Sequence, residues 1–391
     1  MVTCGELRIR RVRFHASPFT HGGPSMPSPM TPRSRWLAAL RCQPVDRLPF
    51  WPKLNGSYAL NQAEPFRSMA IPQLMGWVGA DPHVGGPACS KVLRAKTCAQ
   101  TDQRDGVRTT TYRTPAGDLT SVEHFDPTSQ SWHPREFPVK TEKDIEAMTL
   151  FFADARCEFD PPQVEKAQAT LREQGESAVV VTGIGVSPLM DWIQHLAGIE
   201  NGHYLLADHR EKVEALFAAM HRLILRRAEI VAEKCPIQVV YSTENSSTTL
   251  ISTDQFRGYC MKHLMDYGRI LAGAGKLHVL HMCGHLKAFL PDIATLPAAG
   301  IEAFTSPTVG NTTLLDGRTA CPRTCLIGGT NAELWLHPAE AIIRTIRRDL
   351  DSLPHHRGIV VTSAGVMPPA CTPQTIRQVA EFVRSYRVGD R

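Results

Sequence analysis

The sequence predicts an α/β fold, namely a (β/α)8 TIM barrel with a β-hairpin inserted after the second strand. Short apolar runs alternate with amphipathic helical stretches along the chain, which is the pattern of a parallel sheet covered by helices. Several runs, such as AVVVTG and GIVVTS, are continuous and rich in β-branched residues. Such runs are typical of strands buried on both faces. A chain of 391 residues is a size that this barrel reaches as one domain.

The expected strands account for all eight positions of the barrel. We predict them at Leu48–Lys53, Val78–His83, Ala178–Gly183, Ile237–Ser242, Leu277–Met282, Gly300–Thr305, Thr324–Gly329 and Gly358–Ser363. Amphipathic helices are expected between them, for example at Arg210–Glu233 and Pro338–Leu350. The segment Gly106–Asp126 alternates in polarity and turns at Pro115, which predicts the inserted hairpin. We expect this hairpin to cover the top of the barrel.

The net charge of +5 is concentrated at the start of the chain. Residues 1–35 hold six arginines and one acid, so the remaining residues carry 37 basic and 37 acidic side chains. This balance argues against nucleic acid as a partner. Residues 1–29 are rich in Pro, Gly and Ser. We expect them to be a disordered tail, or the result of a start codon assigned too far upstream, with the real start at Met26 or Met30. Residues 30–391 are then expected to form a single barrel domain.

The cellular compartment is inferred from what the sequence lacks. No apolar run approaches the roughly 18 residues of a membrane-spanning helix, so no membrane partner is expected. Eleven scattered cysteines without an export signal indicate thiols in a reducing, cytoplasmic environment rather than a disulfide framework. Cys321 and Cys325 precede the seventh strand, and we interpret them as structural thiols.

The motif His281-Met282-Cys283 ends the fifth predicted strand. Alternate residues of a strand point to the same side, so His281 and Cys283 can both face one metal ion. Zinc favours nitrogen and sulfur ligands, and active sites of TIM barrels lie where the strands end. A core histidine beside a buried thiol is the alternative interpretation of this motif.

A third ligand is expected from Cys371, which follows the eighth strand in AGVMPPACTP. Thr372 and Pro373 are typical of the N-cap and first residue of a helix, and a thiol at such a place is expected to have a lowered pKa. Glu244 follows the fourth strand, and its carboxylate is a candidate for a fourth, displaceable ligand or for an acid–base group. The alternative for Cys371 is a small apolar residue in a turn, and the alternative for Glu244 is a solvated or salt-bridged acid.

These residues stand in a sequence that resembles the uroporphyrinogen decarboxylase superfamily. The resemblance is carried by HMCGHLKAFLPDIATLPAAGIEAF, MTPRSRWLAALRCQPVDRLPFWP, LAGIENGHYLLADHREKVEALF and CTPQTIRQVAEFVRSY, and it extends from Met30 to Arg387. True decarboxylases of this superfamily have an arginine-rich segment after the first strand, where this chain reads WPKLNGSY. His281, Cys283 and Cys371 match instead the zinc motif of the methylcobamide:coenzyme M methyltransferases and related corrinoid-linked enzymes.

The resemblance to that branch implies Zn²⁺ as cofactor and a methyl-corrinoid (cobalamin) supplied by a partner protein. It also implies a small methyl acceptor, such as coenzyme M, another thiol or tetrahydrofolate. Lys53, Asn55 and Tyr58 after the first strand, and Asp81 after the second, are candidates for binding the polar end of this acceptor. A decarboxylase-like lyase acting on a carboxylated substrate and a non-catalytic zinc-binding barrel are the alternative functions.

Overall fold

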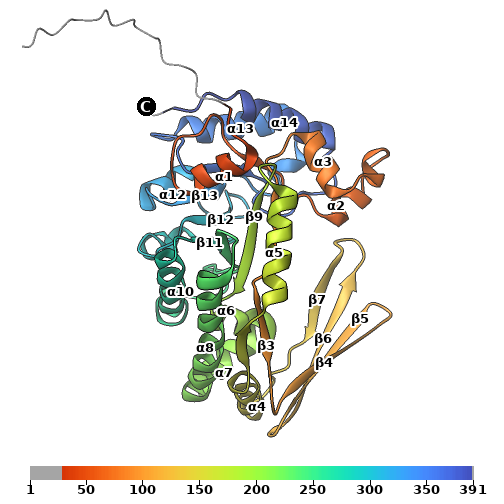
Figure 1. Cartoon of the computed structure of the whole chain (residues 1–391), viewed down its shortest axis with the longest axis vertical. Coiled ribbons are helices and arrows are strands. Elements are labelled where there is room, and N and C mark those ends of the chain that lie inside the picture. Colours follow the sequence, from red (N-terminus) through yellow and green to blue (C-terminus); the bar gives the residue numbers. More distant parts are fainter. Residues whose placement is uncertain (1–28, 390–391) are drawn as a thin grey trace, which may run out of the picture.

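The computed structural model describes residues 29–389, so the predictions for residues 1–28 lie outside the described part of the chain. Eight parallel strands form one sheet in the order β1-β14-β13-β12-β11-β10-β9-β2, which curves into a nearly closed barrel (Figure 1). The strands are β1 (Phe50–Trp51), β2 (His83–Gly85), β9 (Val179–Gly185), β10 (Val239–Ser242), β11 (Leu277–His281), β12 (Gly300–Phe304), β13 (Cys325–Gly328) and β14 (Ile359–Thr362). The predicted TIM barrel is confirmed.

Helices alternate with the strands and surround the barrel (Figure 1). They are α1 (Pro32–Leu40), α2 (Gly56–Leu60), α3 (Ile71–Val78), α4 (Glu142–Ala153), α5 (Pro161–Gln174), α6 (Pro188–Asp191), α7 (Ile199–Asp208), α8 (Arg210–Lys234), α9 (Thr253–Gln255), α10 (Lys262–Gly273), α11 (Leu290–Ile293), α12 (Leu314–Ala320), α13 (Ala339–Asp351) and α14 (Pro373–Ser385). The expected helices at Arg210–Glu233 and Pro338–Leu350 correspond to α8 and α13. Within residues 29–389, no helix combines the length and the apolar character needed to cross a bilayer.

The second strand begins later than predicted. Residues 71–78 form helix α3, which ends where Gly79 adopts a positive φ of 78°. A glycine in this left-handed conformation is a common helix end. The strand itself is β2 (His83–Gly85), so Asp81 precedes the strand instead of following it. This shift moves Asp81 to the opposite end of the barrel from the one expected.

The seam between β1 and β2 is closed by Asp81. Its backbone N–H donates to the carbonyl of Phe50 at 2.7 Å, and its carboxylate accepts from the N–H of Phe50 at 3.0 Å. The same carboxylate forms ion pairs with Arg35 of α1 and with Arg47. A buried charge is stable only when it is paired and hydrogen-bonded, and this one is.

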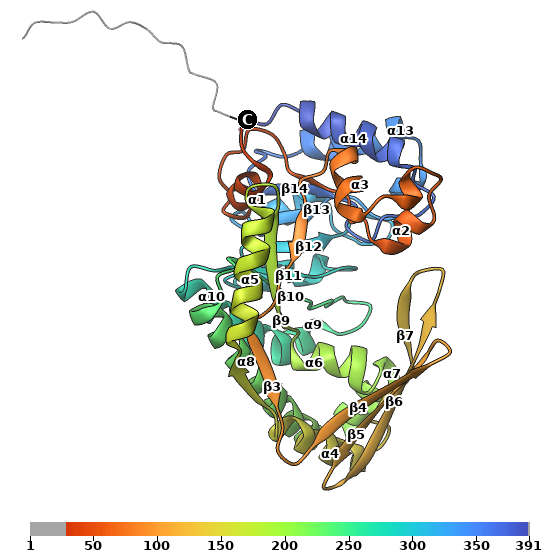
Figure 2. The same ribbon diagram turned by 45° about the vertical axis from the view of Figure 1, so that its right-hand side comes forward.

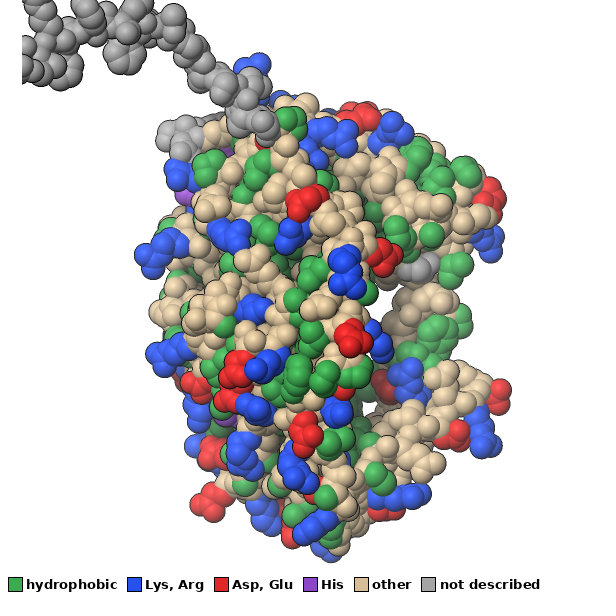
Figure 3. Space-filling view, in the orientation of Figure 1, with side chains coloured by type: hydrophobic (Ala, Val, Ile, Leu, Met, Phe, Trp, Pro, Cys, Tyr) green, Lys and Arg blue, Asp and Glu red, His purple; other side chains and the backbone are tan. Residues whose placement is uncertain are grey.

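The insertion after β2 is larger than the predicted hairpin. The hairpin is confirmed as β5 (Val107–Thr114) and β6 (Gly117–Asp126), but β4 (Cys98–Arg104) and β7 (Ser131–Glu136) extend it to a four-stranded antiparallel sheet. A pair of antiparallel strands, β3 (Ser90–Leu93) and β8 (Arg156–Phe159), joins it to the barrel. The sheet stands away from the barrel body (Figure 2), and Figure 3 shows an open hollow between the sheet and the part of the barrel near α2.

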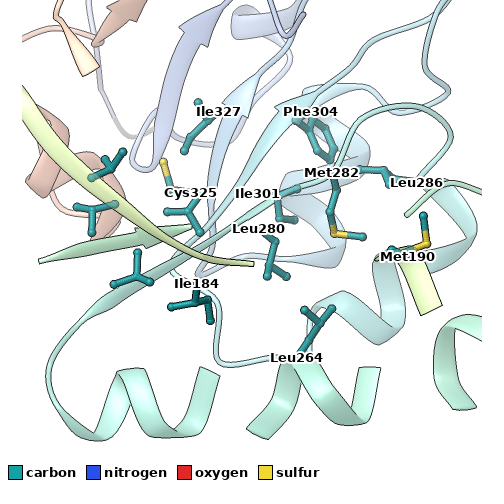
Figure 4. Close-up of a cluster of buried hydrophobic side chains, with 14 of the residues drawn as sticks. Ile184, Met190, Leu264, Leu280, Met282, Leu286, Ile301, Phe304, Cys325 and Ile327 are labelled. Atoms are coloured by element: carbon teal, nitrogen blue, oxygen red, sulfur yellow. The ribbon is translucent and has the colours of Figure 1, made fainter. Parts of the chain in front are cut away.

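The core lies between the barrel strands and the helices around them. Figure 4 shows part of it, in which Leu280, Met282, Ile301 and Phe304 pack with Leu264 of α10 and their neighbours. Met282 is fully buried in this cluster. Because side chains alternate along an extended segment, burial of Met282 on one side leaves His281 and Cys283 on the other.

Candidate active site at the mouth of the barrel

His281 and Cys283 lie together at the mouth of the barrel, the end at which the carboxyl ends of the strands meet. His281 is the last residue of β11, and its side chain is 22% exposed. Cys283 is exposed, and its sulfur lies 3.5 Å from Oδ1 of Asn245. Two side chains of types that can bind a metal therefore lie at the same end of the barrel, close to each other along the chain.

Glu302 is part of this site, although it is not among the site residues predicted from the sequence. The strand register places it opposite His281 on the neighbouring strand β12. The next residue, Ala303, has a positive φ of 58° and lies at a bulge, which interrupts the regular pairing with β13. The Glu302 side chain is only 2% exposed, and its carboxylate binds both Nδ1 of His281 and, at 2.8 Å, Nζ of Lys53. Glu302 thus joins a cation of the first loop to the predicted metal ligand.

His281, Glu302 and Lys53 stabilise one another in their charged forms. Burial opposes ionisation of His281, but its hydrogen bonds with Cys283 and Glu302 and the negative charge of Glu302 raise the pKa of the imidazole to about 9. Burial likewise opposes ionisation of Glu302, whereas the hydrogen bond from His281 and the charge of Lys53 lower the pKa of its carboxyl to about 2. Glu302 is therefore a carboxylate at neutral pH, flanked by two cationic partners.

Cys371 stands on the loop between β14 and α14, which opens on the same end of the barrel. The predicted start of the following helix is confirmed, since Thr372 caps α14 by accepting from the N–H of Thr375 at 3.2 Å and Pro373 is the first helical residue. The expected lowering of the thiol pKa is wrong for this arrangement. Cys371 is 2% exposed, and burial raises the pKa of its thiol to about 12.

The loop that carries Cys371 is held by the segment after β1. The hydroxyl of Tyr58 donates to the carbonyl of Cys371 at 2.6 Å. Nζ of Lys53 donates to the carbonyl of Ala364 at 3.1 Å, and the carbonyl of Lys53 accepts from the N–H of Met367 at 3.2 Å. Lys53 and Tyr58 therefore brace both ends of the loop between β14 and Cys371.

These contacts change the interpretation of the residues after β1. Tyr58 is fully buried, so the prediction that it binds an acceptor is wrong, and its role in the structure is to anchor the Cys371 loop. Asn55 caps α2 by accepting from the N–H of Tyr58 at 3.0 Å. The ammonium of Lys53 is engaged by Glu302. Acceptor binding by Asn55 or Lys53 stays a prediction.

Asp81 is not part of the site. Its carboxylate is fully buried and lies at the amino-terminal end of the barrel, where it is paired with Arg35 at 2.5 Å and with Arg47 at 2.8 Å. The prediction that it binds the acceptor is wrong, because β2 begins after Asp81 and places this residue before the strand, at the end of the barrel away from the mouth.

Glu244 follows β10 as predicted, but its carboxylate is not placed with His281 and Cys283. It is fully buried and accepts from the N–H of Ser187 at 2.9 Å, from the hydroxyl of Ser187 at 2.6 Å and from that of Ser246 at 3.1 Å. Burial raises the pKa of Glu244, although these hydrogen bonds act in the opposite direction. The structure therefore corrects the accessible position expected of Glu244, and a role as ligand or acid–base group stays a prediction.

The predicted zinc ligands are only partly gathered. Between residues 29 and 389, no three His, Cys, Asp or Glu side chains are clustered closely enough to hold one ion. His281 and Cys283 supply one nitrogen and one sulfur donor side by side, and Cys371 supplies a second sulfur on a loop of the same end. This donor set fits zinc by its chemistry. The arrangement described requires the Cys371 loop and the end of β11 to approach each other before three ligands meet.

Comparison with known proteins identifies the family. A family model for uroporphyrinogen decarboxylase (URO-D) matches residues 134–386, which is more than half of the chain. This chain belongs to the uroporphyrinogen decarboxylase family. The matched region contains His281, Cys283, Glu302 and Cys371, so the whole candidate site except Lys53 lies within the family domain. The search of curated proteins found no match.

One of the solved structures found by comparison resembles the chain in fold. A methyltransferase from Methanosarcina mazei superposes with a TM-score of 0.57 at 15% identity, covering 90% of this chain and 98% of that one. A D-psicose 3-epimerase gives a TM-score of 0.32 at 14% identity, covering 56% of this chain and 79% of that one. At such identities the likeness to the methyltransferase concerns the fold, and it extends the barrel assignment beyond the region that the family model matches.

Proposed function

We propose that this chain is a zinc-dependent methyltransferase of the uroporphyrinogen decarboxylase family. It would move a methyl group between a corrinoid carried by a partner protein and a small thiol or tetrahydrofolate-type acceptor. The observation that carries the proposal is the pair His281 and Cys283 at the mouth of the barrel, with Cys371 on a loop of the same end. The fold likeness to the Methanosarcina mazei methyltransferase supports the reaction class.

The residues of the mouth fit a zinc-bound thiol acceptor. When bound by His281, Cys283 and Cys371, zinc would stabilise the thiolate form of the acceptor, which is the nucleophilic form. Glu302 holds His281 by Nδ1, which leaves Nε2 as the ring nitrogen for the metal. In the transfer, a carbon–sulfur bond forms as the carbon–cobalt bond breaks with its electron pair staying on cobalt, and the thiol proton leaves to solvent.

The rim of the mouth supports docking of a large partner. Four exposed apolar side chains lie on the connections that follow different barrel strands, namely Leu60 after β1, Val309 after β12, Leu336 after β13 and Val366 after β14, each 50–58% exposed. Exposed apolar groups on one face are typical of protein or ligand contact. The hollow beside the four-stranded sheet (Figure 3) leaves this end open to a bulky corrinoid.

The alternative of a decarboxylase-like lyase has less support from the site. Recognition of a carboxylated substrate needs cations that are available to its carboxylates. The stretch PKLNGSY that directly follows β1 contains no arginine, and its one lysine, Lys53, is already paired with Glu302. A lyase of this kind would also be active without zinc, which an assay in the presence of a chelator can detect.

The metal is tested first. We expect about one zinc per chain by elemental analysis of the purified protein. Cys283→Ser and Cys371→Ser should each lose most of the metal, because each removes a soft thiolate ligand. Cys98→Ser, which changes an exposed cysteine of β4, is the matched control and should keep its zinc. Full zinc occupancy in both site variants would show that the assigned ligands are wrong.

The reaction is tested with methylcobalamin as donor. The loss of its absorption is followed with coenzyme M, other small thiols or tetrahydrofolate as acceptor, and we expect transfer that depends on zinc. Cobalt-substituted protein adds a second measurement, since an acceptor thiol that enters the site should change the cobalt absorption spectrum. A zinc-loaded protein that transfers no methyl group and shows no spectral response to thiols would instead be a non-catalytic zinc-binding barrel.

A further inference from the structure

We infer that Lys53 and Glu302 are positioning residues that link the two halves of the metal site. One half is His281 with Cys283 at the end of β11, and the other is Cys371 on the loop after β14. Glu302 orients the first half and Lys53 holds the loop of the second, while the two are bound to each other at 2.8 Å. The inference rests on the zinc-binding part of the proposed function and does not depend on the methyl-transfer reaction.

Glu302 controls which nitrogen of His281 can meet a metal. It is the neighbour of His281 in the register of β11 and β12, so the backbone keeps the two side chains together. Its carboxylate accepts a hydrogen bond from Nδ1. A histidine whose Nδ1–H is held by a carboxylate presents Nε2 as donor in a fixed ring orientation, and removing such a partner typically weakens metal binding about 10- to 100-fold.

Lys53 reaches the second half through both its side chain and its backbone. Its ammonium group donates to the carbonyl of Ala364, and its carbonyl accepts from the N–H of Met367. Both contacts lie within seven residues upstream of Cys371 in the loop after β14. The Lys53 side chain is 15% exposed, so solvent competes only weakly for its ammonium group.

The ion pair between Lys53 and Glu302 lies where it can help the three ligands to come together. Three ligands are not yet gathered in the described residues, and Cys371 is buried at 2% exposure. Metal binding must therefore bring the Cys371 loop and His281 into one coordination sphere. A cation that holds the loop and a carboxylate that holds His281, bound to each other, restrict how far apart these parts can move and reduce the entropy lost when they meet.

The test is a titration of metal-free protein with Co²⁺, combined with a double-mutant design. Glu302→Gln and Lys53→Met are each made alone and in the background of Cys371→Ser. We expect each single variant to weaken Co²⁺ binding about tenfold. In the Cys371→Ser background, Glu302→Gln should keep its effect because it acts through His281, whereas Lys53→Met should lose most of its effect because it acts through the Cys371 loop.

The absorption spectrum of the Co²⁺-loaded protein tests independently whether Lys53 positions the Cys371 loop. Thiolate-to-cobalt charge-transfer bands should lose intensity in Lys53→Met, in which the second cysteine is less well placed, and Lys53→Arg should restore part of the loss. Lys287→Met removes a lysine of the same end, one that pairs with Asp316 at 3.2 Å at the surface, and should bind Co²⁺ as the unmodified protein does. Thermal unfolding of each variant confirms that the protein is folded at the titration temperature.

Three results would overturn the inference: unchanged Co²⁺ affinity in both single variants, an equal loss for Lys53→Met with and without Cys371, or no Co²⁺ binding by the unmodified protein. Failure of the proposed methyl transfer would look different. A protein that shows the expected affinity pattern but transfers no methyl group would refute that reaction and leave the roles of Lys53 and Glu302 intact.

Discussion

Two buried ion networks stand at opposite ends of the same barrel and differ in what they leave accessible. At the amino-terminal end, Asp81 is bound by Arg35 and Arg47 and fastens the seam between β1 and β2. At the mouth, Glu302 is bound by Lys53 and His281. Both networks centre on a carboxylate that is nearly or completely buried between two basic side chains.

The difference lies in the surroundings of each carboxylate. Asp81 accepts from two guanidinium groups and a backbone N–H, and its partners continue into further protein contacts such as Asp46. Glu302 instead binds His281, which lies two residues before the exposed thiol of Cys283. A network enclosed by protein stabilises the fold, whereas one that ends at an accessible nucleophile is a place where chemistry can occur.

Replacing the two carboxylates by amides of the same shape tests this comparison, and the largest effect is expected at Asp81. Asp81→Asn leaves Arg35 and Arg47 without their shared counter-charge in a buried place, so we expect a loss of about 3–5 kcal/mol in the free energy of unfolding. Urea unfolding measures it. Zinc content per folded chain should not change, and a loss below about 1 kcal/mol would show that the seam does not depend on this network.

Glu302→Gln, the matched substitution at the mouth, should lower the free energy of unfolding by less than Asp81→Asn does. In metal-free protein, Glu302→Gln keeps an oxygen that can accept from Lys53 and leaves His281, whose side chain is 22% exposed, in contact with solvent. We expect a loss of about 1–3 kcal/mol by the same urea measurement. A cost equal to that of Asp81→Asn would contradict the distinction between an enclosed network and an accessible one.

The comparison also shows what could be predicted from the sequence. The barrel and the pair His281 and Cys283 follow from local patterns, namely alternation of strands and helices and alternation of side chains along one strand. Glu302 could not be found in this way. Only the register of its strand GIEAF with β11 places it beside His281, and this register cannot be deduced from a local pattern. The presence of Glu302 in an otherwise apolar run was the available signal.

The wrong predictions, like the missed Glu302, arise where the structure depends on more than a local sequence pattern. Asp81 was assigned to the wrong end of the barrel because the second strand was predicted at Val78–His83, whereas it begins only at His83, after a helix that ends at Val78. Tyr58 was predicted to bind the polar end of an acceptor, but its hydroxyl instead donates to the loop that follows β14. Contacts between loops that are distant in the sequence leave no local pattern, so the bracing of Cys371 could be recognised only in the structure.

The smallest effect is expected at Asp46, on the edge of the enclosed network. Burial alone would raise the pKa of Asp46, but its hydrogen bonds from Arg35, Met30 and Arg47 and the charge of Arg35 outweigh this and lower it. A carboxyl whose pKa is lower in the folded than in the unfolded chain stabilises the fold above the unfolded value of about 3.9, and this contribution disappears as the pH falls through the folded value.

Asp46→Asn should therefore lower the free energy of unfolding by about 1 kcal/mol near pH 7, because its side chain is only 17% exposed but lies at the edge of the network. The difference in the free energy of unfolding between this variant and the unmodified protein should shrink steadily as the pH is lowered below about 4. Urea unfolding at a series of pH values measures it. Glu381→Gln, which breaks an exposed pair with Arg377, is the control and should change stability little at any pH. A difference that persists unchanged into strong acid would mean that Asp46 acts through packing and not through its charge, and the amino-terminal network would then end at Asp81.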